Sequence, residues 1–233
     1  MPARRAFAAL PALLLTLAGP AAARPTLSRV LARTFRFYGG VDALLGVGAL
    51  RVQGRLTDVS SAPGNAPRLE RLVQPPERFL EAVSLGGIER EAVVLDGGRA
   101  FRDGAEVTGL ARADQIRLEA ARSFLPAALA RERSALLDRG EAERGGRRVR
   151  LVEFPLHDGA ALTAEIDPGS GRILAAVTRV AGRETRVSFR RLRPVSGILF
   201  PFEEEAVARE GRTKLLVEDV EVLPAEAVRI EHP

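Results

Sequence analysis

Apolar residues recur every three or four positions from Leu27 to Tyr38, and the glycine pair Gly39-Gly40 follows them. This spacing predicts an amphipathic first helix that begins after Thr26 and ends at the glycines. A short helical turn is predicted next, over 41–45.

From residue 49 the period changes from helical to alternating. In the segment ALRVQGRL, Leu50 and Val52 alternate with Arg51 and Gln53, which is typical of a half-buried strand. The turn residues Asp96-Gly97-Gly98 predict a tight hairpin. Strands are predicted at 68–74, 78–85, 89–95 and 99–104.

The middle of the chain returns to helical spacing. A broad apolar helical face runs over Leu110–Arg133 and is interrupted at Pro126, so the pattern predicts a central helix that is kinked or split. Alternating segments then resume, separated by turn residues such as those of 167–171. They predict strands at 147–154, 161–166, 173–180, 185–192, 200–208 and 214–222.

Consecutive hairpins at this spacing indicate one antiparallel meander. A sheet of about ten strands curls strongly or closes, because large flat open sheets are unusual. The predicted fold class is therefore α+β, mainly antiparallel β, and we expect a single domain over 24–233, with no internal repeat and no linker to a second domain.

Composition narrows the function. With 46% hydrophobic and 28% charged residues the chain can build a core, which excludes a disordered protein. It has no cysteine and two histidines, so few side chains remain for nucleophilic, metal or redox chemistry.

The first 23 residues predict the compartment. A basic start at Arg4 and Arg5 precedes an apolar stretch and the small residues Ala21-Ala22-Ala23, the order of a cleavable secretory signal peptide. An uncleaved membrane anchor is the alternative, but prolines interrupt a stretch that barely reaches spanning length. We expect a periplasmic product without a lipid anchor, since the chain lacks the cysteine on which bacterial lipoproteins are acylated.

Three segments carry a resemblance to a known superfamily. They are FYGGVDALLGVGALRVQGRL, EIDPGSGRILAAV and FRRLRPVSGILFPFEEE. With them the chain resembles the periplasmic lipoprotein carriers and their outer-membrane receptor, the lipoprotein-sorting proteins of outer membrane biogenesis. The resemblance implies a strongly curved, incompletely closed β-barrel, helices that cap its open side, and an apolar cavity for acyl chains.

Apolar residues on the predicted strands and central helix are candidates to line that cavity, although ordinary core packing is the competing interpretation for each. A low aromatic content, 5%, favours space inside a wide barrel. The candidate lining residues are Leu50, Val52, Leu72, Phe79, Phe124, Leu125, Leu151, Val187, Phe189, Phe200 and Phe202.

Candidate catalytic and metal-binding residues are few. His157 lies in a predicted turn and His232 at the C-terminal end, where histidines are usually solvated. The run Glu203-Glu204-Glu205 could suggest a calcium site, but alternate faces of a strand favour a solvated edge. No nucleophile elbow, phosphate loop, dinucleotide fingerprint or metalloprotease motif occurs, so we expect no enzyme, no metal and no cofactor.

The formal charge of +5 raises nucleic acid as a partner. Without residues 1–23 the charge falls to +3, and no aromatic residues interleave the arginines, so nucleic acid is not expected. Arg186 and Arg190 share one face of a predicted strand and form a candidate basic docking surface for an anionic membrane surface or a membrane receptor.

The sequence thus predicts a periplasmic carrier or chaperone-like protein that binds an acyl chain or a lipoprotein lipid moiety. Two alternatives remain: an envelope interaction or scaffold protein with a filled barrel, and a hydrolase that depends on His157.

Overall fold

The computed structural model describes residues 26–58, 66–74, 78–155 and 160–224. Four helices occur within these residues: α1 (Leu27–Phe37), α2 (Val41–Gly46), α3 (Leu110–Ser123) and α4 (Leu125–Arg131). The predicted central helix is split at Phe124, and Pro126 occupies the first turn of α4, where a missing N–H costs nothing.

Thirteen strands form one sheet in the described part of the chain. They are β1 (Ala49–Asp58), β2 (Arg68–Gln74), β3 (Arg78–Leu85), β4 (Ile88–Asp96), β5 (Arg99–Arg102), β6 (Ala105–Glu106), β7 (Leu137–Arg144), β8 (Arg147–Pro155), β9 (Ala161–Ile166), β10 (Ile173–Val180), β11 (Arg183–Val195), β12 (Ile198–Ala208) and β13 (Gly211–Leu223).

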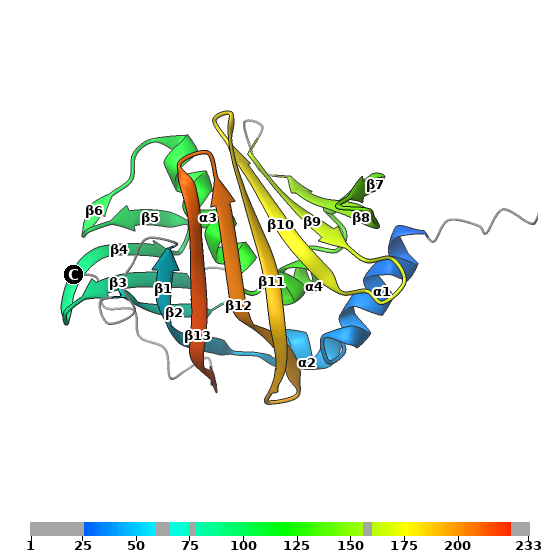
Figure 1. Ribbon diagram of the computed structural model, residues 1–233, viewed down its shortest axis with the longest axis horizontal. Helices are drawn as coiled ribbons and strands as arrows, with labels where there is room; N and C mark the ends of the chain where they lie inside the picture. Colours follow the sequence, from blue (N-terminus) through cyan, green and yellow to red (C-terminus); the bar gives the residue numbers. More distant parts are fainter. Residues whose placement is uncertain (1–25, 59–65, 75–77, 156–159, 225–233) are drawn as a thin grey trace, which may run out of the picture.

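The strand order is β6-β5-β4-β3-β2-β1-β13-β12-β11-β10-β9-β8-β7, so each strand pairs with its neighbour in sequence except that β1 pairs with β13. All pairs are antiparallel, and β6 and β7 are the free edges. The sheet is therefore curved but not closed, as predicted (Figure 1).

Helices α3 and α4 connect the two edge strands. The chain lays down β1 to β6, crosses the sheet as α3 and α4, and returns through β7 to β13 (Figure 1). Helix α3 contacts β4 and β5 of one half and β9 and β10 of the other. We call the face that α3 and α4 cover the inner face, and the opposite one the outer face.

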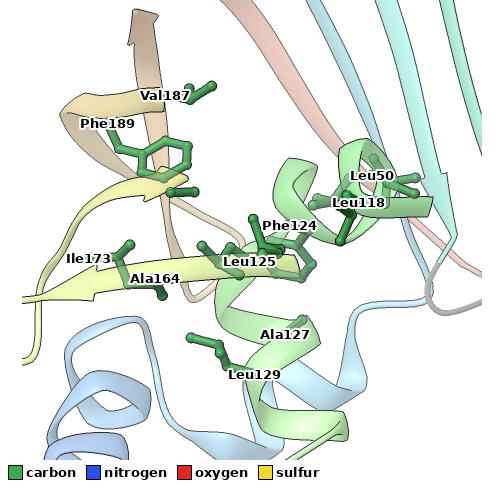
Figure 2. Packing of buried hydrophobic residues seen from close by; sticks show 14 of the residues in the cluster. Leu50, Leu118, Phe124, Leu125, Ala127, Leu129, Ala164, Ile173, Val187 and Phe189 are labelled. Carbon is green, nitrogen blue, oxygen red and sulfur yellow. The ribbon is translucent and has the colours of Figure 1, made fainter. Parts of the chain in front are cut away.

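Alternation along the strands assigns the core to the inner face. Leu50, Val73, Phe79 and Leu95 are register partners on β1 to β4, and all four side chains are buried. The intervening Arg51 is exposed on the outer face. Apolar side chains from α3 and α4 complete this core (Figure 2).

The three segments that carry the family resemblance meet around the end of α1. Tyr38 is buried there, and its hydroxyl accepts a hydrogen bond of 3.2 Å from the Ile173 N–H. Gly39 has a φ of +117°, and a Cβ at this position would lie 2.3 Å from the Gly197 carbonyl oxygen. These contacts explain why glycines are needed at this junction.

Strands β6 and β7 were not predicted. Residues 137–144, LDRGEAER, show no apolar alternation because β7 is an edge strand with mostly polar side chains. Its hydrogen bonds to β8 place it in the sheet. Strand β6 is too short, at two residues, for any periodic signal.

Candidate functional site

A pocket of about 240 Å³ lies between the two helices and the inner face of the sheet. Strands β2, β4 and β8 contribute Val73, Leu95 and Phe154, and the helices cover them. The remaining lining residues are Arg78, Gly98, Arg117, Leu118, Ala120, Ala121, Phe124, Ala128, Arg131 and Glu132.

Local sequence explains why this pocket is apolar and open. Leu118 and Ala121 lie three residues apart on one side of α3, Phe124 is the residue between the two helices, and Ala128 lies on α4; all four border the pocket. Two of them are alanines, whose small side chains leave space between helix and sheet. The pocket is somewhat smaller than a site for a drug-sized ligand.

Four charged residues, three arginines and Glu132, border this mainly apolar pocket. Arg78 Nε donates to an Asp96 carboxylate oxygen at 3.1 Å, and Arg117 Nη1 to Asp114 at 2.9 Å. Arg131, the last residue of α4, has no ion pair among the described residues. Burial lowers the pKa of its guanidinium.

Nine of the eleven predicted lining residues belong to the inner-face core or contact it. Figure 2 shows several of them, including Leu50, Phe124, Leu125, Val187 and Phe189. Only Phe124 borders the pocket itself. The ring centroids of Phe124 and Phe200 are 6.5 Å apart, so this part of the inner face is filled by α4.

The other two predicted lining residues, Leu72 and Leu151, lie on the outer face. Leu72 pairs with Arg51, and Leu151 pairs with Glu165. Their neighbours Val73 and Val152 face the core instead. Both segments have apolar residues at adjacent positions, so the hydrophobic pattern alone does not decide which one points inward.

A buried ionic cluster lies on the inner face, and sequence reasoning missed it. Arg71 Nε donates to Glu81 at 2.7 Å, and Arg71 Nη1 to Glu204 at 3.2 Å. Arg122 of α3 donates to the other oxygen of Glu204 at 3.3 Å. Burial opposes the charge of Arg71, but the carboxylates of Glu204 and Glu81 raise its pKa above the usual value.

Alternation contained the signal for this cluster. Arg71 shares a strand face with the buried residues Leu69 and Val73, and Glu204 shares one with Phe200 and Phe202. A charge on an apolar face needs a partner of opposite sign in the folded protein. The sequence could therefore have predicted that both residues are paired, although not with each other.

The prediction of a solvated edge at Glu203-Glu204-Glu205 is wrong. Glu203 and Glu204 are only 3% and 4% exposed, because cationic side chains cover both of them. On the outer face, Lys214 lies 2.9 Å from Glu203, and this contact holds the pKa of Glu203 below its usual range. The alternation of faces within the run is as predicted, but its charges are used for ion pairs.

The candidate docking residues Arg186 and Arg190 lie on the outer face with acidic partners. Arg186 donates to Ser188 at 2.8 Å and to Glu165, and Arg190 lies 3.1 Å from Glu205. Arg190 is exposed and Arg186 is half-buried. Their role as a docking surface stays a prediction.

Some predictions fall outside the described residues. These are the signal peptide over 1–23, His157 and His232. Within the ranges that the structure does describe, none of the helices has both the length and the apolar character needed to span a bilayer.

Comparison with known proteins identifies the fold. No protein-family model and no curated protein sequence matches the chain. Among solved structures, a LolA superfamily protein from Nitrosomonas europaea superposes with a TM-score of 0.56 at 13% identity, over 87% of this chain and 96% of that one. A putative outer membrane lipoprotein-sorting protein domain from Vibrio parahaemolyticus gives 0.49 at 12% identity, over 82% and 90%. The chain thus has the fold of the LolA superfamily protein from Nitrosomonas, the fold that its sequence resemblance implied.

Proposed function

We propose that this protein is an exported carrier that shelters an acyl chain, or the lipid moiety of a lipoprotein, between its two central helices and the inner face of the sheet. The apolar pocket beside α3 and α4 is the observation that carries the proposal. The likeness to lipoprotein carriers supports the same class of cargo, and the predicted signal peptide supports a periplasmic location.

Binding follows from burial of apolar surface. Each methylene group transferred from water into the pocket contributes about 0.8 kcal/mol. The pocket of about 240 Å³ holds part of a long acyl chain in the conformation described. A whole chain would extend along the inner face, so α3 and α4 would have to move away from the sheet as a lid.

One feature favours a movable lid. The two helices are separated by the break at Phe124, so each can move without unfolding the other. Helix α3 is tied to β12 through the Arg122–Glu204 pair, so opening of the lid would have to break this ion pair and expose both groups to water. Release of cargo at a membrane or receptor would use the same motion.

The test is binding of an uncharged fluorescent dodecyl probe to the full chain, with one matched pair of variants. Ala121→Phe on α3 fills the pocket, and we expect roughly tenfold weaker binding. Ala111→Phe puts the same side chain on an exposed position of the same helix, and it should bind as the parent does. Native mass spectrometry of protein recovered gently from cells should show a co-purifying lipid. No probe binding by the parent and no lipid would overturn the proposal.

A scaffold protein with a filled interior is the second candidate. The tight packing of Phe124 against Phe200 supports it, because α4 leaves only about 20 Å³ of space beside these rings. This alternative predicts that neither variant changes any property except stability, and that a protein partner is recovered in place of lipid.

A further inference from the structure

Arg131 has an unusual environment for a guanidinium group. Its Nη2 atom lies 3.5 Å from the carbonyl oxygens of Leu45 and Val47, at the limit of hydrogen bonding. Its Nη1 atom is buried and has no hydrogen-bond partner. The guanidinium group has five N–H donors, and these two long contacts use only one of its nitrogen atoms.

The neighbouring arginines differ from Arg131. Arg78 and Arg117 border the same pocket, and each pairs with an aspartate at 3.1 Å or less. Glu132 also borders the pocket, next to Arg131 along the chain, but within the described residues it forms no ion pair with it. Arg131 is half-buried, and this partial loss of hydration without a counter-charge lowers the pKa of its guanidinium.

The other residues that line the pocket indicate the chemistry of a ligand. Leu118, Phe124, Ala128 and Phe154 offer no hydrogen-bonding side chain, so they suit a hydrocarbon tail. Arg131 lines the same cavity, and its buried, unpartnered Nη1 would reach an occupant after a turn of the guanidinium group. Together they match a molecule with an apolar tail and an anionic head, since the planar guanidinium pairs well with carboxylate and phosphate oxygens.

We infer that the pocket binds a single-chain amphiphile with an anionic head group, with its carboxylate or phosphate on Arg131 and its hydrocarbon tail against Leu118, Phe124 and Phe154. The inference rests on the proposed carrier function and narrows its cargo. A neutral glyceride would leave the guanidinium without a counter-charge, whereas a fatty acid or an alkyl phosphate supplies one.

The experiment compares three ligands of equal chain length on the full chain: dodecanol, dodecanoate and dodecyl phosphate, each below its micelle concentration, as competitors of the uncharged dodecyl probe. We expect an anionic ligand to bind roughly tenfold tighter than dodecanol, the effect of one charge-assisted hydrogen-bonded contact. Comparison of dodecanoate with dodecyl phosphate then shows which head group is preferred. The anionic preference should shrink as salt is raised from 0.05 to about 0.5 M.

Variants assign the effect to Arg131. Arg131→Gln should bring the anion-to-dodecanol ratio close to one while dodecanol affinity is kept, and Arg131→Lys should retain part of the preference. Arg133→Gln, an exposed arginine two residues further on, is the matched control and should leave the ratio unchanged.

The outcomes separate the two proposals. If the parent binds none of the three ligands nor the probe, the carrier function itself fails. If dodecanol binds as tightly as the anions, or if the preference survives in Arg131→Gln, the carrier function stands and the anionic cargo is refuted. Should Arg131→Gln fail to fold, the parent's salt dependence and the Arg131→Lys ratio still decide the question.

Discussion

Glu204 on β12 accepts a hydrogen bond of 3.2 Å from Arg71 on β2, a residue 133 positions away in the sequence. In the sheet, β1 and β13 lie between the two strands. The bond therefore spans the junction between the first and last strands across the inner face. It joins the two halves of the sheet at the place where α3 also rests, through Arg122.

Arg71→Met should destabilise the protein by about 3 kcal/mol, because it removes the counter-charge that the buried Glu204 and the partly buried Glu81 share, and leaves Glu204 with Arg122 alone. Urea unfolding followed by circular dichroism measures the loss. Arg51→Met is the matched control, since Arg51 is exposed and its ion pairs contribute at most about 1 kcal/mol. Equal effects of the two substitutions would contradict the structural role of the cluster.

Tyr38 should ionise at a higher pH than an ordinary tyrosine. Burial raises its pKa to about 12, although the hydrogen bond with Ile173 and the charge of Arg172 act in the opposite direction. The chain has one tyrosine and no tryptophan, so absorbance near 295 nm reports this group alone. A midpoint near 10 in the folded protein would show that the hydroxyl is not buried as described.

The same shift predicts a loss of stability at high pH. The folded state holds the phenol proton more tightly than the unfolded state does, so this contribution is complete below pH 10 and is lost as the pH rises toward about 12. Tyr38→Phe should reduce this alkaline decline, with a cost of about 1 kcal/mol at neutral pH for the lost hydrogen bonds. Urea unfolding between pH 8 and 11 tests both expectations.

Gly39→Ala should destabilise the protein more than Gly40→Ala. Both glycines have a positive φ, +117° and +98°, so both substitutions strain the backbone by about 1–2 kcal/mol. At Gly39 the new Cβ would also lie 2.3 Å from the Gly197 oxygen, whereas at Gly40 no atom lies within 4 Å. Thermal unfolding of the pair isolates the close contact, and a smaller loss at Gly39 than at Gly40 would disprove its importance.

Glu119→Gln should stabilise the protein relative to the parent, and this gain should be larger at pH 8 than at pH 4. Burial raises the pKa of the Glu119 carboxyl on α3, against hydrogen bonding from Gln115 and the charge of Arg122. A raised pKa contributes stability below the unfolded-state value near 4.3 that is lost as the pH rises through the folded-state value. The amide cannot ionise, so it removes this loss. Glu89→Gln at an exposed position is the control, and an identical pH profile for both variants would refute the expectation.

Most of the fold could be predicted because its signals are local. Alternation in β1 to β4 and β8 to β13, the turn residues, and the break near Pro126 each depend on neighbours along the chain. Strand β7 could not be predicted, since an edge strand with polar side chains lacks a buried face to specify it. For Leu72 and Leu151, adjacent apolar residues made both faces plausible.

The sequence by itself determined an antiparallel meander with a helical segment in its middle, and it indicated which residues are apolar enough to form a core. Only the tertiary structure decided how α3 and α4 pack against the sheet. This packing leaves a pocket beside Ala121 and fills the space at Phe200. It also decided that Arg71 meets Glu204 and that Arg131 meets no carboxylate in the described chain. Periodicity is a property of adjacent residues, whereas cavities and ion pairs depend on the positions of segments that are distant in sequence, and folding alone brings these together.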